Sequence, residues 1–125
     1  MLVKCGSVAN SPFRVNAYIN SMNRALNSSA VVALRSVYVH YIQPAPGAGL
    51  DEASGKDKVE IIDQILTYDA PVPSDDVLGQ VLVSAVSQAA DQPIALPDSC
   101  YLVQVVPRPG TISPWSSKAT NILHN

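Results

Sequence analysis

The sequence predicts an α+β domain in which helices pack on one face of a small sheet. Apolar residues recur at helical spacing in three segments, and they alternate with a period of two in two others. Stretches rich in proline and glycine separate these segments. A chain of 125 residues, 47% of them hydrophobic, is long enough to form one domain with a core.

The first helix is predicted within residues 10–29. Ser11 is suited to cap it, and Pro12 suits the first helical position, where no backbone donor is needed. Residues 27–29, Asn-Ser-Ser, are predicted to end it. Six residues are expected to face inward from one side of this helix: Val15, Tyr18, Ile19, Met22, Ala25 and Leu26.

Strands are predicted where the apolar pattern changes to a period of two. In residues 37–42 both alternating rows are apolar or aromatic, which is typical of a central strand. Residues 100–106, CYLVQVV, show the same pattern and predict a second strong strand. The initial MLVKC predicts a short further strand.

Two more helices are expected between these strands, and a last one near the end of the chain. Residues 57–68 return to the helical period, with Val59, Ile62, Ile65 and Leu66 facing inward. Ser74 is predicted to cap the next helix, with Asp75 and Asp76 in its first turn. Its inner face is expected to hold Leu78, Val81, Leu82, Ala85, Val86 and Ala89. Ser113 and Pro114 predict the start of the last helix.

Charge and composition narrow the classes of partner. A net charge of −2 and a pI near 5.5 argue against a nucleic-acid-binding protein. Residues 51–76 carry eight acids and two lysines, which predicts a solvated face. Two cysteines, no secretory signal and no apolar run long enough for a bilayer predict a reduced, cytoplasmic protein with no membrane partner.

No catalytic or metal constellation is visible in the sequence. Cys5, Cys100, His40 and His124 do not fall at the spacings that bring ligands into one tetrahedral site. The S-x-x-K spacing fails, because Trp115 stands three residues before Lys118. The stretch PGTISPWSSK combines a glycine, hydroxyls and a lysine at a helix start, which suits an anion. The alternative is a rigid turn whose Trp115 packs on the domain or on a neighbour.

Residues 105–122, VVPRPGTISPWSSKATNI, resemble the signature near the N-terminus of the large, single-chain phosphoribosylformylglycinamidine synthases. These are the glutamine-dependent amidotransferases of purine biosynthesis. Looser similarity upstream comes in the same order, with SPFRV, LRSVYVHYI and QILTYDAP. The resemblance covers essentially all 125 residues.

The resemblance implies that residues 1–125 form the N-terminal, small S-subunit-like scaffold domain, truncated so that the sheet lacks its last strand. It implies no catalytic, cofactor-binding or metal-binding residue in this chain, which alone would be inactive. The ATP- and Mg-dependent synthetase region and the glutaminase domain of the parent enzyme are the implied partners.

An inter-domain interface is expected at the proline-framed elbow. Its candidate residues are Arg108, Thr111, Ser113, Trp115, Ser116 and Lys118. Two other hypotheses stay open. One is a stand-alone module that self-associates through an open sheet edge, and the other is a small enzyme or anion-binding protein that uses the GTISPWSSK turn.

Overall fold

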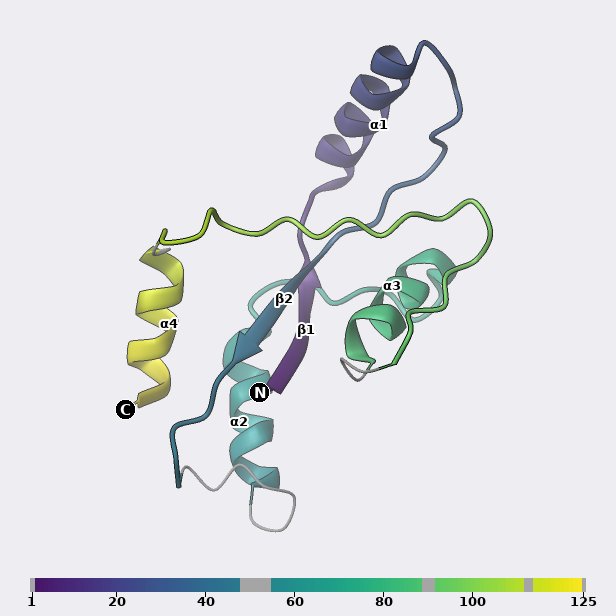
Figure 1. Ribbon diagram of the computed structural model, residues 1–125. Coiled ribbons are helices and arrows are strands. Elements are labelled where there is room, and N and C mark those ends of the chain that lie inside the picture. Colours follow the sequence, from purple (N-terminus) through teal and green to yellow (C-terminus); the bar gives the residue numbers. More distant parts are fainter. Residues whose placement is uncertain (1, 48–54, 89–91, 112–113, 125) are drawn as a thin grey trace. The chain divides into compact units, whose positions relative to one another are not determined.

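The computed structural model describes residues 2–47, 55–88, 92–111 and 114–124. The first of its two units is Met1–Ala95 and the second is Leu96–Asn125. The elements of the first unit are β1 (Leu2–Val8), α1 (Pro12–Leu26), β2 (Val37–Ile42), α2 (Lys56–Leu66) and α3 (Val77–Ser87) (Figure 1). The second unit holds α4 (Pro114–His124). A small sheet with helices packed against it confirms the predicted α+β class.

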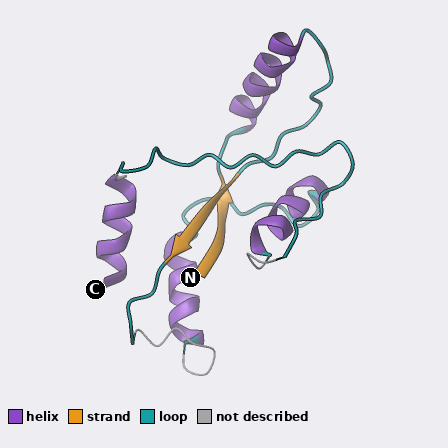
Figure 2. Ribbon diagram, viewed as in Figure 1, coloured by secondary structure: helices purple, strands orange, loops and turns teal. Residues whose placement is uncertain are grey.

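The sheet consists of β1 and β2, which lie side by side and run antiparallel (Figure 2). Lys4 pairs with His40 and Cys5 with Val39, but the next pair joins Val8 to Val37. Two residues of β1 therefore stand opposite one residue of β2, which is a β-bulge. The short first strand is confirmed, and it is longer than predicted.

Helix α1 begins and ends where the sequence predicts. The hydroxyl of Ser11 accepts a hydrogen bond from the Arg14 N–H at 3.3 Å, and Pro12 occupies the first turn. Asn27 adopts the left-handed conformation with φ 48°, and its N–H donates to the Arg24 carbonyl. Ser28 donates to the Asn23 carbonyl. This pair of bonds is the Schellman arrangement that closes a helix at its C-terminus.

Helix α2 is joined to β1, and the residues after it lie against β2. Ile62 and Leu66 are buried, and Lys4 on β1 forms an ion pair with Asp63 at 3.1 Å. The ring of Tyr68 lies 6.1 Å from that of the buried His40, in an edge-on orientation. His40 is therefore a packed histidine.

Helix α3 packs on both strands, and the predicted cap is wrong. Ser74 and Asp75 form a turn, and Asp76 caps the helix by accepting from the Gly79 N–H. The turn is closed by a hydrogen bond from the Asp76 N–H to the Pro73 carbonyl, which leaves the Asp76 side chain at the capping position. Gly79 is buried, and a Cβ there would lie 2.5 Å from Cγ1 of Val72.

The predicted strand at residues 100–106 is wrong. No described residue pairs with this segment in a ladder, and Tyr101 and Val105 are 92% and 91% exposed. A period-two pattern gives only a preference for extended backbone, whereas a strand also needs a hydrogen-bonding neighbour. Among the described residues β2 pairs with β1 alone, so it is not a central strand.

The core is small. Among the side chains that the structure describes, the buried hydrophobic ones are Ile62, Leu66 and Ala85. The inner face predicted for α1 is not fully buried: Val15, Ile19 and Met22 are half-buried, and Tyr18, Ala25 and Leu26 are exposed. Within the described ranges, no helix has the length and apolar character needed to cross a membrane.

Replacing Gly79 with alanine tests the close contact between α3 and the loop before it. We expect an overpacking cost of about 1–3 kcal/mol to exceed the gain in helix propensity of about 1 kcal/mol. Urea denaturation should therefore show a lower free energy of unfolding for Gly79→Ala. The matched control is Ser84→Ala on the exposed side of α3. Equal stability of the two variants would contradict the contact.

Burial of His40 predicts a loss of stability at mildly acidic pH. Desolvation lowers the pKa of His40 below its ordinary value of 6.5, so the unfolded chain binds the proton more readily. The stabilising contribution is complete above pH 6.5 and falls as the pH drops toward the folded-state pKa. Denaturation at pH 7.5 and 5.5 should reveal this loss. We expect His40→Leu to remove this loss of stability and His124→Gln to retain it. The opposite pattern would contradict the assignment of the loss to His40.

Candidate functional site

The elbow of the second unit is built on a type II turn. The Thr111 N–H donates to the Arg108 carbonyl at 3.0 Å, with Pro109 and Gly110 between them. Gly110 has φ 81°, the positive value that the third position of this turn requires. The ring of Pro109 fixes φ at the second position. The backbone of the elbow is therefore held by two local constraints and one hydrogen bond.

The predicted interface residues are divided between this turn and α4. Arg108 and Thr111 are joined by the turn and are exposed, and Lys118 is an exposed residue of α4. Ser113 lies outside the described residues. Trp115 and Ser116 belong to α4, but their side chains lie outside the described part of the structure. The inter-domain role of these residues stays a prediction.

A groove in the first unit was not predicted from the sequence. It has a volume of about 330 Å³ and lies among the end of β1, the start of α1, the residues leading into β2 and the loop before α3. More than half of its lining residues are apolar. They are Val8, Asn10, Pro12, Val15, Asn16, Leu34, Arg35, Ser36, Val37, Val72, Pro73, Asp76 and Gly79.

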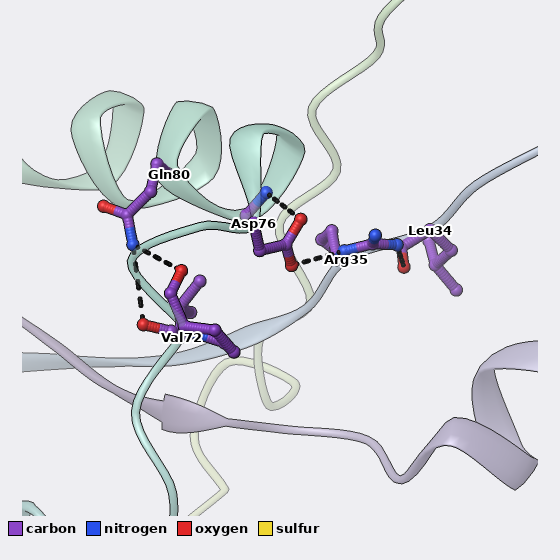
Figure 3. Close-up of polar contacts among 7 residues, drawn as sticks. Leu34, Arg35, Val72, Asp76 and Gln80 are labelled. Atoms are coloured by element: carbon purple, nitrogen blue, oxygen red, sulfur yellow. Dashed lines mark hydrogen bonds and ion pairs between the residues drawn. The ribbon is translucent and has the colours of Figure 1, made fainter.

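One carboxylate organises the polar side of this groove (Figure 3). Asp76 accepts from Arg35 Nε at 2.7 Å through one oxygen and from the Gly79 N–H at 3.2 Å through the other. Gln80, one turn along α3, donates to the carbonyls of Val72 and Pro73 at 3.5 and 3.0 Å. The start of α3 is therefore tied both to its own loop and to the segment before β2.

Hydrogen bonding holds the pKa of Asp76 below its ordinary value of 3.8. The bond from the Arg35 side chain is the main cause, and the Gly79 N–H adds to it. Both stabilise the carboxylate form. The sequence offers no local signal of this pairing, because Arg35 and Asp76 are 41 positions apart.

The groove is suited to binding or packing and not to acid–base catalysis. Its one arginine is already neutralised by Asp76, and its lining holds no histidine, cysteine or lysine. Over the described ranges, no group of three or more His, Cys, Asp or Glu residues is placed to hold a metal ion. Burial raises the pKa of the Cys5 thiol, which disfavours the reactive thiolate.

Variants of Asp76 separate its two roles. Asparagine retains a good capping oxygen but loses the charge, whereas alanine loses both. We expect the midpoint of thermal unfolding at pH 7 to fall in the order wild type, Asp76→Asn, Asp76→Ala. Because the folded pKa is depressed, the charge contributes fully above pH 3.8 and is lost as the pH falls through the folded-state value. A difference between wild type and Asp76→Asn that persisted below that value would contradict the ion pair.

Comparisons with known proteins identify the family. The family model described as "Formylglycinamide ribonucleotide amidotransferase N-terminal" matches residues 37–125, which include β2, the groove residues of α3 and the elbow. Phosphoribosylformylglycinamidine synthase of Saccharomyces cerevisiae is 40% identical over 121 residues, which are 95% of this chain and 8% of that protein. No solved structure matches the chain. Both findings confirm the resemblance carried by residues 105–122, and the chain belongs to the formylglycinamide ribonucleotide amidotransferase N-terminal family.

Proposed function

We propose that this chain is the N-terminal scaffold domain of a longer phosphoribosylformylglycinamidine synthase of purine biosynthesis. The observation that carries the proposal is the yeast relative. The similarity covers 95% of this chain but only 8% of the yeast protein. A segment of that size in so long an enzyme is one domain among several.

In this proposal the chemistry belongs to the rest of the enzyme. The longer protein would convert formylglycinamide ribonucleotide to its amidine with ATP, Mg and glutamine in the cytoplasm. The synthetase and glutaminase regions would hold the reacting groups and the nucleotide. This chain alone would be inactive.

The elbow would supply the contact with those regions. The type II turn presents Arg108 and Thr111 on backbone that is already constrained, so little conformational entropy is lost when a partner binds. Lys118 adds an exposed cation from α4. Together with Ser113, Trp115 and Ser116 these residues would form a joint that helps enclose the route of ammonia between the two catalytic regions.

A second candidate function is self-association of a stand-alone module. The observation that favours it is the two-stranded sheet, in which each strand has one edge without a ladder partner among the described residues. Unpaired edges are templates for pairing with another chain. Size-exclusion chromatography over a dilution series tests it, and a monomer at every concentration would eliminate this function.

The coupling role predicts an unequal loss of two activities. In a full-length synthase that carries this chain, Trp115→Ala or Lys118→Ala should lower glutamine-driven turnover by roughly 10- to 100-fold, since a misplaced joint leaks ammonia. Ammonia-driven turnover should change much less. Assays with glutamine and with ammonium salts measure the ratio.

The control is Lys56→Ala, which removes an exposed lysine from α2. It should leave both activities close to those of the wild type. Equal losses of glutamine-driven and ammonia-driven turnover in the elbow variants would argue against coupling, since they would indicate general damage to the enzyme.

A further inference from the structure

Helix α1 carries an apolar stripe that is only partly covered in the structure. The stripe consists of Val15, Tyr18, Ile19, Met22 and Leu26, which the helical repeat brings to one side. Tyr18 and Leu26 are 45% and 61% exposed, and the other three are half-buried. We call these five residues the α1 stripe.

The helix keeps its shape although its apolar stripe is only partly covered. Described contacts of the first unit join the two strands to each other and α3 to the strands, but α1 packs extensively on none of these elements. An isolated helix of 15 residues is marginal in water. Local bonds compensate: both ends are capped, and the Asn23 amide both donates to and accepts from the backbone of Val31, at 2.9 Å each.

The stripe is continuous with the groove. Val15 belongs to both, and the groove extends the apolar surface through Val8, Leu34, Val37 and Val72. The combined surface therefore runs from the wall formed by the start of α3 onto the partly covered apolar side of α1. A patch of this kind, on a helix that is already formed, is typical of a docking surface.

An exposed cation, Arg14, borders this surface. The first 50 residues contain Lys4, Arg14, Arg24 and Arg35 and no acid. Lys4 and Arg35 are paired with carboxylates of the first unit. Arg14 and Arg24, both on α1, form no ion pair with any residue that the structure describes. By its position in the helical repeat, Arg14 borders the α1 stripe beside Tyr18.

We propose that the α1 stripe and the groove together dock an amphipathic segment with acidic residues, supplied by the synthase regions of the longer polypeptide. The proposal rests on the proposed function, because more than nine-tenths of the yeast relative lies outside the matched stretch. Apolar side chains of the segment would cover the stripe, and its carboxylates would pair with Arg14. This surface is distinct from the elbow, which belongs to the other unit.

A protein segment fits this surface better than a membrane does. Helices that lie on anionic bilayers carry several Lys or Arg residues on the polar face. The polar residues of α1 are mostly uncharged Asn and Ser, with only two arginines in 15 residues. Recognition by one or two ion pairs beside an apolar strip is instead characteristic of a helix-in-groove contact.

Hydrogen exchange in a full-length chain tests the docking. This chain replaces the matching stretch of the yeast synthase, and amide exchange of α1 is compared with that in the 125-residue chain alone. We expect α1 to exchange at least roughly tenfold more slowly in the full-length protein. Met22→Glu and Arg14→Glu should each abolish that protection. High salt should reproduce the loss of α1 protection caused by Arg14→Glu when it is added to the full-length protein without the substitution.

The matched control is Phe13→Glu. Phe13 is 82% exposed, lies opposite the stripe in the helical repeat, and shares the first turn with Arg14. The Phe13→Glu variant should retain the slow exchange of α1 in the full-length protein. Circular dichroism of each variant as the isolated chain shows whether α1 still forms, and Arg14→Glu, at an exposed site, serves if Met22→Glu unfolds.

Other occupants give different results, and each would overturn the proposal. Protection already present in the dilute isolated chain would mean that the chain's own residues cover the stripe. Protection that rises with concentration would indicate a second copy, and protection that needs anionic vesicles would indicate a membrane. Activity of the chimera with an unprotected α1 would remove the docking site and leave the proposed function intact. A protected α1 in an inactive chimera would support the docking site and argue against the proposed function.

Discussion

The first unit depends on one carboxylate that performs two tasks. Asp76 caps α3 through one oxygen and binds Arg35 through the other. A cap alone would start the helix but leave its direction free, and an ion pair alone on the surface would contribute little. Joined in one side chain, they hold the start of α3 beside the segment that leads into β2. The groove exists because these two segments are kept together with the start of α1.

Features determined within a few residues could be predicted from the sequence, and those that need distant partners could not. Ser11, Pro12 and Asn27 define α1 by contacts that span five residues or fewer. At α3, three successive residues are good caps, and the turn after Pro73 together with the distant Arg35 favours Asp76 over Ser74. Residues 100–106 have the composition of a strand, but the ladder that would make them one depends on residues elsewhere.

The elbow and the groove differ in the same way, because the sequence predicts the first and not the second. The type II turn follows from the Pro109-Gly110 pair, because proline fixes one dihedral angle and glycine permits the positive one. The groove draws its walls from three stretches of sequence, within residues 8–16, 34–37 and 72–79. No pattern within any one of them predicts a cavity. The apolar stripe of α1 was visible in the sequence as a buried face, and only the structure reveals that it is covered in part.

Capped helix ends compensate in part for the small core. With few fully buried hydrophobic side chains, hydrophobic burial within the unit can supply only part of the stability of a domain of this size. Helix caps, the bidentate Asn23 amide and the Asp76 network then keep α1 and α3 formed without complete cover. Apolar side chains that stay exposed on α1 and at residues 101–106 remain available to a partner. A domain built in this way would gain stability from any partner that covers these side chains, because binding to the folded form is thermodynamically linked to folding.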